Sequence, residues 1–342
     1  METLNKFNVV HEPDKLNEDV WSKFVLENKH GNIFQTPEMY RVYLDTEGYE
    51  PVLTAILNKN EDIVAIMLGS LKEETGSFAR RFSNRVLVSG GPLISYEVVG
   101  GTLLDKILKA HTTYVKKKAI FTEVRNLSPL VELQPYFEAA EYRYIPHAST
   151  YLDLSPGTEQ LWNSLSSKRR QQIRKAGKKG LKTFVISIDD LDDLYELFEE
   201  TYQRISFPVP RKSLFKSILS ILQSKNLARV IGVRYEEKLV SVLVNLLYKD
   251  IMYAWYCAVN MQYTRMHCNE YMFWNAFEWG VENGYKFFDF GGGGAPEEED
   301  GVRVFKERMG GMTRETGRYE CIHARLKHKV ATLGFKFWRA IR

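Results

Sequence analysis

Residues 228–259 read ARVIGVRYEEKLVSVLVNLLYKDIMYAWYCAV, and this stretch holds three runs rich in β-branched and aromatic residues. Two of the runs, 228–235 and 239–247, flank the polar turn 236–238, and this arrangement predicts a β-hairpin. The third run, 251–259, predicts another strand. Its nine residues are too few for a membrane-spanning helix, which needs about 20. We therefore expect a small β-sheet at the centre of this half of the chain.

Helices are expected on either side of this predicted sheet in the sequence. Residues 157–178 predict a helix before the hairpin, and residues 269–283 predict a second helix that stops at Gly284. Residues 286–290 then predict a strand that leads directly into Gly291–Gly294. A helix, a hairpin, a strand, a helix and a strand in this order indicate a fold of the α/β class.

The first half of the chain repeats the same order of elements. A hairpin is predicted over 52–57 and 63–71, followed by a strand over 85–89. A helix over 102–118 and a buried strand over 120–124 complete the series. Two halves with the same order suggest an internal duplication of one α/β unit.

Length and composition set the class of protein. The chain has 342 residues, more than twice the ~150 typical of one domain, so two domains are expected. Hydrophobic residues make up 44% and aromatic residues 13%, and this aromatic content excludes an intrinsically disordered protein. Cys257, Cys268 and Cys321 are too few for a disulfide framework or a four-cysteine zinc site. Residues 1–15 are too polar for a signal peptide, and we expect a cytoplasmic protein.

The domain boundary is expected near Thr150. We predict a first domain over 1–150, completed by residues 320–342, and a second domain over 151–319. The final stretch, 324–342, has an apolar residue every three or four positions, six Lys or Arg and no acidic residue. Such a stripe either packs back on the first domain or lies at a membrane surface.

A strongly basic segment lies near the start of the predicted second domain. Residues 168–182 contain eight Lys or Arg and no acidic residue. The candidate contacts for a phosphate or nucleic-acid backbone are Lys168, Arg169, Arg170, Arg174, Lys175, Lys178 and Lys179. The alternative is a solvated helix face, although such a face usually mixes charges of both signs.

Two segments near the end of the second half could carry chemistry. Glycines 291–294 would let the backbone approach a ligand closely, or could form a flexible loop. No Gly-Lys-Ser/Thr closes this run and acidic residues 297–300 follow it, so neither a Walker-type phosphate loop nor a dinucleotide fingerprint is present. Downstream, Lys306 lies within 302–311 and could stabilise negative charge during acyl transfer. Asp289 could act as a general base or could satisfy backbone groups.

In this order the motifs resemble those of the FemAB family of peptidyltransferases. The resemblance rests on Phe34-Gln35-Thr36 at the start of an early helix, on Ser167–Gly180, on Phe288–Gly292, and on Val304-Phe305-Lys306 ahead of Gly310-Gly311. It covers essentially the whole chain. It implies two acetyltransferase-like (GNAT) domains in tandem, each a mixed central sheet flanked by helices. The chain resembles the compact members, which lack a long helical hairpin inserted in the second domain.

The resemblance also implies a reaction. Family members transfer an amino acid from aminoacyl-tRNA to an amine of a UDP-linked or lipid-linked peptidoglycan precursor, without metal or coenzyme A. On that model Lys306 would steady the tetrahedral intermediate beside the backbone of Phe305. The precursor would be bound by Arg204, Arg41, Tyr253, Tyr256, Gly291 and Gly292. Arg41 departs from the family, which more often has Lys there, and the 168–182 segment would meet tRNA or anionic precursor.

Two other functions compete with this interpretation. The segment 162–292 also resembles GNAT-fold acyltransferases of surface polysaccharide synthesis, which would transfer an acyl group from acetyl-CoA or another acyl-CoA to an amino sugar or nucleotide-sugar. Their coenzyme A loop is rich in glycine, whereas residues 260–268 here contain none. The second alternative is a non-catalytic module that binds RNA or anionic lipid through its basic segments.

Overall fold

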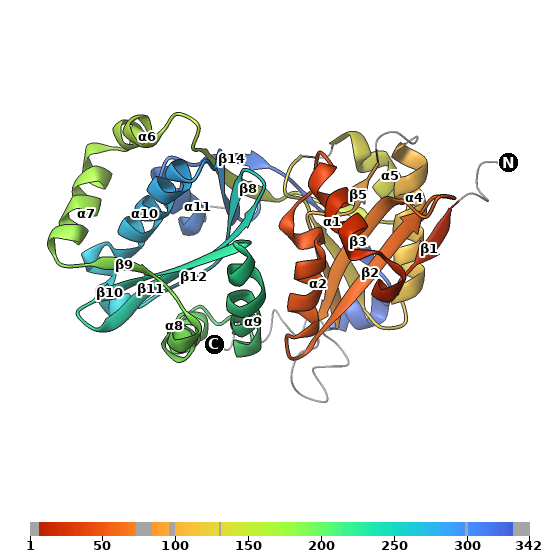
Figure 1. Cartoon of the computed structure of the whole chain (residues 1–342), viewed down its shortest axis with the longest axis horizontal. Coiled ribbons are helices and arrows are strands. Elements are labelled where there is room, and N and C mark those ends of the chain that lie inside the picture. The colour runs from red at the N-terminus through yellow and green to blue at the C-terminus, as the bar shows by residue number, and fades with distance from the viewer. Residues whose placement is uncertain (1–6, 73–83, 96–99, 130, 298–299, 331–342) are drawn as a thin grey trace. The chain divides into compact units, whose positions relative to one another are not determined.

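The computed structural model describes residues 7–72, 84–95, 100–129, 131–297 and 300–330 (Figure 1). The chain divides into two compact units: unit 1 comprises 1–146 and 316–342, and unit 2 comprises 147–315. Each unit is built on its own β-sheet. Within the described ranges, no helix has the length and apolar character needed to cross a membrane.

Unit 1 is built on a sheet with the strand order β1-β2-β3-β4-β6-β15-β7, and β5 pairs with β3. The strands are β1 (Asn8–Val10), β2 (Tyr49–Leu57), β3 (Ile63–Lys72), β4 (Arg85–Ser89), β5 (Leu93–Ile94), β6 (Phe121–Arg125), β7 (Arg143–Ile145) and β15 (Arg318–Ile322). Its helices are α1 (Glu18–Glu27), α2 (Pro37–Leu44), α4 (Gly100–Val115) and α5 (Gln134–Ala139). The hairpin predicted over 52–57 and 63–71 is confirmed as β2 and β3.

Unit 2 has a seven-stranded sheet with the order β14-β8-β13-β12-β11-β10-β9. The strands are β8 (Ala148–Asp153), β9 (Lys182–Val185), β10 (Ala228–Tyr235), β11 (Lys238–Tyr248), β12 (Ile251–Val259), β13 (Phe287–Gly292) and β14 (Met312–Glu315). The helices are α6 (Thr158–Ser164), α7 (Ser167–Lys178), α8 (Leu191–Arg204), α9 (Lys212–Ser217), α10 (Cys268–Glu282) and α11 (Gly301–Arg308). The hairpin β10–β11 and the strand β12 confirm the prediction from 228–259.

The two sheets share one pairing pattern. In each, four consecutive antiparallel strands lead to one parallel pair, β4–β6 or β12–β13, and two antiparallel strands follow. The strand that follows the parallel pair has a different origin in each unit. In unit 1 it is β15, which pairs with β6 and comes from a distant part of the sequence. In unit 2 it is β8, which pairs with β13 and comes from the start of the unit. The repeated order of elements in the sequence thus corresponds to two sheets of the same kind.

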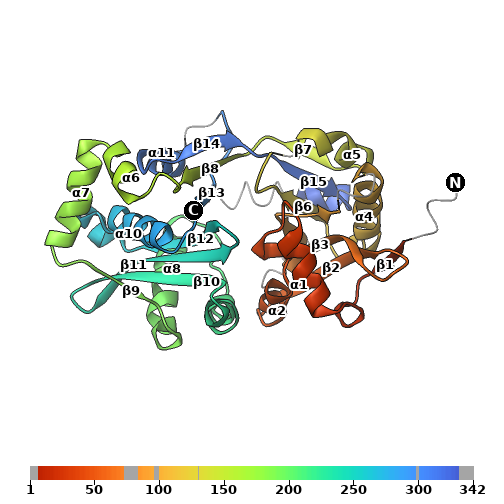
Figure 2. The same ribbon diagram turned by 45° about the horizontal axis from the view of Figure 1, so that its top comes forward.

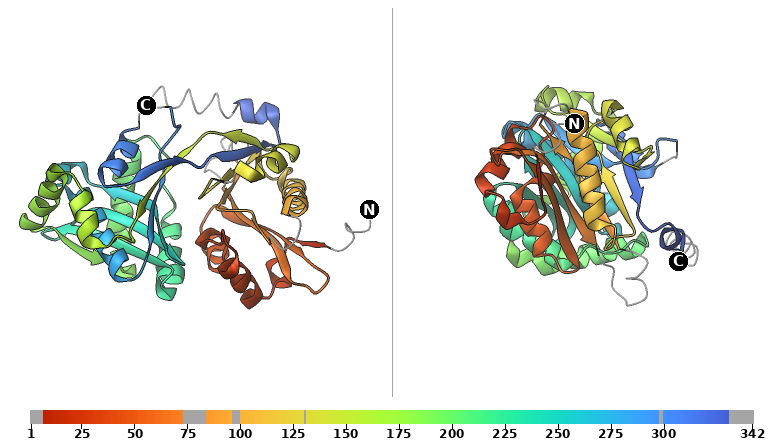
Figure 3. Two further views of the ribbon diagram at one scale, coloured as in Figure 1. Left: turned by 90° about the horizontal axis from the view of Figure 1, so that it is seen from above. Right: turned by 90° about the vertical axis from the view of Figure 1, so that its right-hand side faces the viewer.

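The core of unit 2 lies between its sheet and α10, and α8 covers the opposite face (Figures 2 and 3). Phe277 of α10 packs edge-on against Phe288 of β13, with ring centroids 4.9 Å apart. On the other face, the ring of Phe198 in α8 lies 6.3 Å from that of Tyr256 in β12. The sheet therefore separates an aromatic core from a second layer of helices.

Some elements differ from those predicted. The helix predicted over 157–178 is two helices, α6 and α7, because Ser166 begins a new one by accepting a hydrogen bond from the Arg169 amide. The strands β8, β14 and β15 have no counterpart in the prediction, since each is short and mixes polar with apolar residues. Of the basic final stretch 324–342, residues 325–330 are helical and 331–342 lie outside the described residues.

Candidate functional site

The two parallel strands of unit 2 separate before they end. β12 and β13 are paired only where Ile251–Tyr253 face Phe287–Asp289. β12 then continues to Val259 without pairing to β13. In unit 1 the equivalent strands β4 and β6 stay paired from Arg85 and Phe121 to their last residues. Only in unit 2 does the parallel pair open alongside the glycine run.

The glycines at this opening have a definite conformation. Gly291 adopts φ +75°, a left-handed conformation that disfavours side chains with a Cβ atom. Its amide donates to Asp289 Oδ1 at 2.7 Å, and the pairing register between β13 and β8 shifts between Asp289 and Gly292. Because of this bend, the carbonyl oxygens of Gly291 and Gly292 accept hydrogen bonds from a side chain outside the sheet.

That side chain is Lys306. Its Nζ donates to the Gly292 oxygen at 2.6 Å and to the Gly291 oxygen at 3.2 Å. Lys306 lies on α11 with only 7% of its surface exposed. The helix begins at Asp300, whose carboxylate accepts hydrogen bonds from the amides of the first turn. The structure thus brings together Lys306, Gly291 and Gly292, which the sequence offered as separate candidates.

Close packing holds α11 in this position. The Phe305 ring lies 5.5 Å from the ring of Phe273 in α10, so the side chain belongs to the core rather than to an open site. After the helix, a Cβ atom on Gly311 would lie 2.5 Å from Thr150 and 3.0 Å from the Lys306 carbonyl oxygen. The Gly310-Gly311 motif is therefore needed for the close approach of the chain to β8 after Lys306.

The site contains two ionisable groups whose proton affinities are brought close together. Burial lowers the pKa of Lys306 to about 8, although the Asp289 carboxylate counteracts this by favouring the ammonium. Burial raises the pKa of Asp289 to about 7, and the Gly291 amide and Lys306 oppose that rise. Both groups therefore titrate near neutral pH, as ionisable groups at catalytic sites often do.

Asp289 faces away from the aromatic core. Its neighbours Phe288 and Phe290 pack toward α10, and side chains alternate along a strand. Tyr253 and Tyr151 stand opposite Asp289 on the two adjacent strands, so the three residues share one face. Burial, and then the negative Asp289, raise the pKa of Tyr253, which keeps its hydroxyl protonated. Tyr151 was not predicted, because β8 itself was not recognised.

Tyr256 and Arg204 lie on the same side of the sheet as α8. The Tyr256 ring lies 5.7 Å from that of Phe215 in α9. Arg204 is the last residue of α8 and is exposed, and its side chain makes no hydrogen bond or ion pair to the residues that the structure describes. Its guanidinium is therefore available for an anionic ligand.

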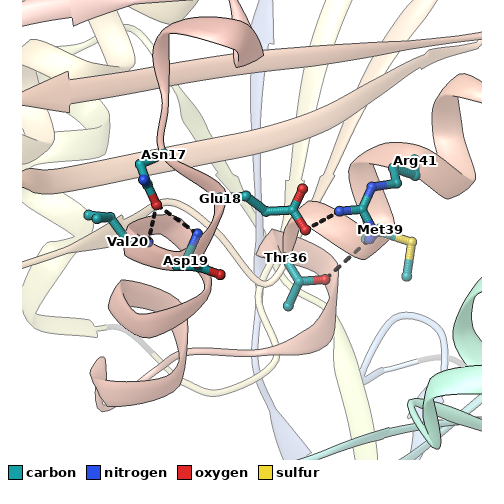
Figure 4. Close-up of polar contacts among 7 residues, drawn as sticks. All are labelled: Asn17, Glu18, Asp19, Val20, Thr36, Met39 and Arg41. Carbon is teal, nitrogen blue, oxygen red and sulfur yellow. Dashed lines mark hydrogen bonds and ion pairs between the residues drawn. The ribbon is translucent and has the colours of Figure 1, made fainter.

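Arg41 belongs to unit 1 and already has an anionic partner. Thr36 begins α2 by accepting a hydrogen bond from the Met39 amide, as its sequence position predicts. One turn later, the Arg41 guanidinium pairs with the carboxylate of Glu18 at the start of α1 (Figure 4). This pairing raises the pKa of Arg41. A phosphate bound there would have to displace Glu18.

The basic helix α7 carries arginines that contact the rest of unit 2 and lysines that are exposed. Arg169 is buried, pairs with Glu270 of α10 at 2.5 Å, and lies over the ring of Phe305. Arg170 donates to the Leu165 carbonyl oxygen at 2.6 Å and so closes the end of α6. Arg174 stacks on Trp162 at 5.0 Å. All three arginines were predicted to contact a phosphate or nucleic-acid backbone. For Arg169 this prediction is corrected, because its charge is used inside the fold.

The lysines of the same segment are exposed. They are Lys168, Lys175, Lys178, Lys179 and Lys182. None of these side chains has an ion pair or hydrogen bond with the described ranges of the chain. A patch of unneutralised lysines on one segment remains suited to a phosphate-rich partner.

The segment between β12 and α10 forms a 3₁₀-helix, Met261–Met266. The amides of Gln262 and Tyr263 donate to Asn260, and that of His267 donates to the Thr264 carbonyl. These donors are occupied within the segment, whereas a diphosphate at this position would need several of them. No cluster of His, Cys, Asp and Glu suited to a metal occurs in the described part of the chain.

Comparisons with known proteins place this architecture. Residues 167–299 match the family model described as "Acetyltransferase (GNAT) domain". The structure of FemX is similar over 94% of this chain and 99% of its own, with a TM-score of 0.71 and 14% identity. A tandem GNAT protein of the clavulanic acid biosynthesis pathway is similar over 93% and 99%, with a TM-score of 0.59 and 9% identity. The chain has a tandem GNAT fold.

This result confirms the predicted fold class of two mixed sheets flanked by helices. L-PGS from Bacillus licheniformis is a further similar structure, with a TM-score of 0.56, 16% identity, and coverage of 91% of this chain and 92% of its own. No curated protein matches the chain significantly in sequence. At these identities the likeness establishes the tandem GNAT fold and nothing finer.

The coupling between Asp289 and Lys306 is testable through the pKa of the lysine. In Asp289→Asn the Gly291 hydrogen bond can persist, but the negative charge that favours the ammonium is gone. We expect the pKa of Lys306 to fall below its present value of about 8. The measurement is the pH dependence of acetylation of Lys306 by acetic anhydride, followed by mass spectrometry, since only the neutral amine reacts.

The matched control is Glu307→Gln, because Glu307 is the exposed neighbour of Lys306 on α11. That variant should retain the pH midpoint of the unmodified protein. An unchanged midpoint in Asp289→Asn would mean that the carboxylate does not act on Lys306.

The buried pair between α7 and α10 predicts a stability effect. Arg169→Met removes the nearest partner of the largely buried Glu270 carboxylate and leaves His267 Nδ1, 3.7 Å away, beside it. Breaking a fully buried pair typically costs about 3–5 kcal/mol, which is the upper bound here. Adding Glu270→Leu should recover most of this loss. Urea denaturation of the full chain measures both, with Lys175→Met on the exposed face of α7 as control. If Arg169→Met were as stable as that control, the pair would not hold α7 to α10.

Proposed function

We propose that this protein is an N-acyltransferase that transfers an aminoacyl group from aminoacyl-tRNA to an amine of a peptidoglycan-type precursor, either UDP-linked or lipid-linked. In this proposal unit 2, predicted as 151–319, is the catalytic side. Unit 1, predicted as 1–150 with 320–342, is the acceptor side. Because aminoacyl-tRNA is a cytoplasmic donor, the reaction would take place in the cytoplasm.

The observation that supports this proposal most directly is the buried ammonium of Lys306 at the opening between β12 and β13. In acyl transfer, the acceptor nitrogen attacks the ester carbonyl, a C–N bond forms, and the carbonyl oxygen takes up negative charge. A pre-oriented cation in a water-poor site stabilises that oxygen. The C–O bond to the tRNA ribose then breaks, and the proton released by the nitrogen ends on the ribose hydroxyl. The chemistry requires no metal or coenzyme.

The remaining candidate residues fit binding roles in this scheme. Tyr253 beside Asp289 and Tyr256 on the same strand would line the path of the acceptor amine. Arg204 would bind the diphosphate of the precursor, and it is exposed and unpaired among the described residues. In unit 1, Arg41 would bind a phosphate only by giving up Glu18. The lysines of α7 would contact the tRNA backbone.

A coenzyme A-dependent reaction is the second candidate, and one observation favours it. The family model that matches residues 167–299 is described as an acetyltransferase domain. Against it stand the 3₁₀-helix at 261–266 and its occupied amides. A diphosphate bound at this segment would need several of these amides to be free.

Replacement of Lys306 tests the proposed chemistry. Lys306→Met keeps a long side chain in the same packing but removes the charge and its two hydrogen bonds. Circular dichroism verifies that the variant is folded. We expect at least a hundredfold loss of turnover, the usual effect of removing one oxyanion-stabilising group. The assay is transfer of a radiolabelled amino acid from charged tRNA to a UDP-linked muropeptide. Arg308→Met, exposed on the same helix, is the matched control.

The same assay separates the two donors. Transfer from aminoacyl-tRNA with none from acetyl-CoA would support the proposal, and transfer from acetyl-CoA alone would replace it by the second candidate. Turnover in Lys306→Met equal to that of Arg308→Met would show that the site has been misassigned.

Charge reversal on α7 tests the tRNA contact. The variant Lys175→Glu, Lys178→Glu, Lys179→Glu changes exposed residues only. Its affinity for tRNA should fall steeply, and the remaining binding should depend less on salt because fewer counterions are released. Filter binding over a salt series measures this, with Lys59→Glu in the β2–β3 turn of unit 1 as control. Equal salt slopes in the triple variant and the control would exclude α7 from the contact.

A further inference from the structure

Unit 2 contains a cavity of about 440 Å³ that is separate from the Lys306 site. It lies between the sheet and the carboxyl-terminal half of α10. Strands β9 to β12 supply its floor, and Asn275, Glu278, Trp279 and Glu282 of α10 are part of its wall. A second cavity of about 320 Å³ adjoins it and shares Val185, Arg229 and Trp279. None of the residues around the Lys306 ammonium lines either cavity.

Arg229 stands between the two cavities with an unused charge. Its guanidinium stacks on the indole of Trp279 at 4.4 Å. It forms no ion pair or hydrogen bond with the described part of the chain, and burial lowers its pKa. Arg234, on the same strand, also stacks on an aromatic ring, that of Phe184, but pairs with Asp190 at 2.6 Å. Arg229 thus has an aromatic ring that orients its guanidinium, but no carboxylate of the described residues is paired with it.

A buried amide in the first cavity is also unsatisfied. Asn245 of β11 has no exposed surface, and its Oδ1 has no hydrogen-bond partner in the described residues. Its Nδ2 reaches only the Arg229 carbonyl oxygen at 3.4 Å. A polar group buried without a partner is costly and rare in folded proteins. Asn245 lines the first cavity, so a ligand bound there is a candidate donor for this oxygen.

We propose that this cavity binds a small zwitterion of the free amino acid class. The carboxylate would bind the Arg229 guanidinium, and the ammonium would donate to Asn245 Oδ1. Two further carboxylates in the wall, Glu278 and Glu282, favour a cationic group and disfavour a dianion such as phosphate. Apolar wall residues, including Ile231 and Met252, leave room for a side chain. The site is independent of the reaction proposed at Lys306.

The test is isothermal titration of the full chain with each of the common amino acids and, separately, with inorganic phosphate. We expect saturable binding of at least one amino acid, and a loss of about tenfold or more in affinity in Arg229→Met, because a charged hydrogen bond is removed. Arg234→Met is the matched control, since it removes a stacked arginine of the same strand outside the cavity, and it should bind normally. Circular dichroism verifies that both variants are folded.

Asn245→Leu provides a second readout that does not depend on loss of folding. Replacing an unsatisfied buried amide by an apolar side chain of similar size should raise the thermal midpoint of the unliganded protein and abolish amino acid binding. Binding of no amino acid, equal affinity in Arg229→Met and Arg234→Met, or tight phosphate binding that requires Arg229 would each overturn the proposal. A lower midpoint in Asn245→Leu would mean that the amide serves the fold instead of a ligand.

Discussion

The buried ammonium of Lys306 is the interaction on which the candidate site depends. A charge in an apolar interior is stable only if nearby groups replace its water. Here the carbonyl oxygens of Gly291 and Gly292 do so, and they are available because β13 leaves the ladder of β12 after Asp289. The opened strand pair, the left-handed glycine and the position of α11 are therefore parts of one arrangement.

The same principle explains why the basic helix α7 is divided in function. Arg169 serves the interior, where Glu270 and the ring of Phe305 replace its hydration, and it links α7 to both α10 and α11. The exposed lysines carry the charge that a polyanion would meet. A count of positive residues in the sequence cannot separate these groups, because burial is decided by the partners that the fold supplies.

The two units share one strand order but differ in how far their parallel strands stay paired. In unit 1 the parallel pair β4–β6 is closed along its length, so its backbone groups are satisfied within the sheet. In unit 2 the corresponding pair opens and its carbonyls bind a side chain. The cavity between the sheet and α10 adds a second polar region to unit 2. Among the described residues, the Arg229 guanidinium there has no ion pair and Asn245 Oδ1 has no hydrogen-bond partner.

Local patterns in the sequence determined much of this protein. The hairpin β10–β11, the strand β12 and the cap at Thr36 follow from alternation, turn residues and side-chain hydrogen bonding within a few positions. The motifs around Gly291 and Lys306 marked the candidate site. Only the tertiary structure decided that these two segments meet, that β8 and β15 complete the sheets, and that Arg169 is buried. Those outcomes depend on contacts between residues far apart in sequence, which no local pattern encodes.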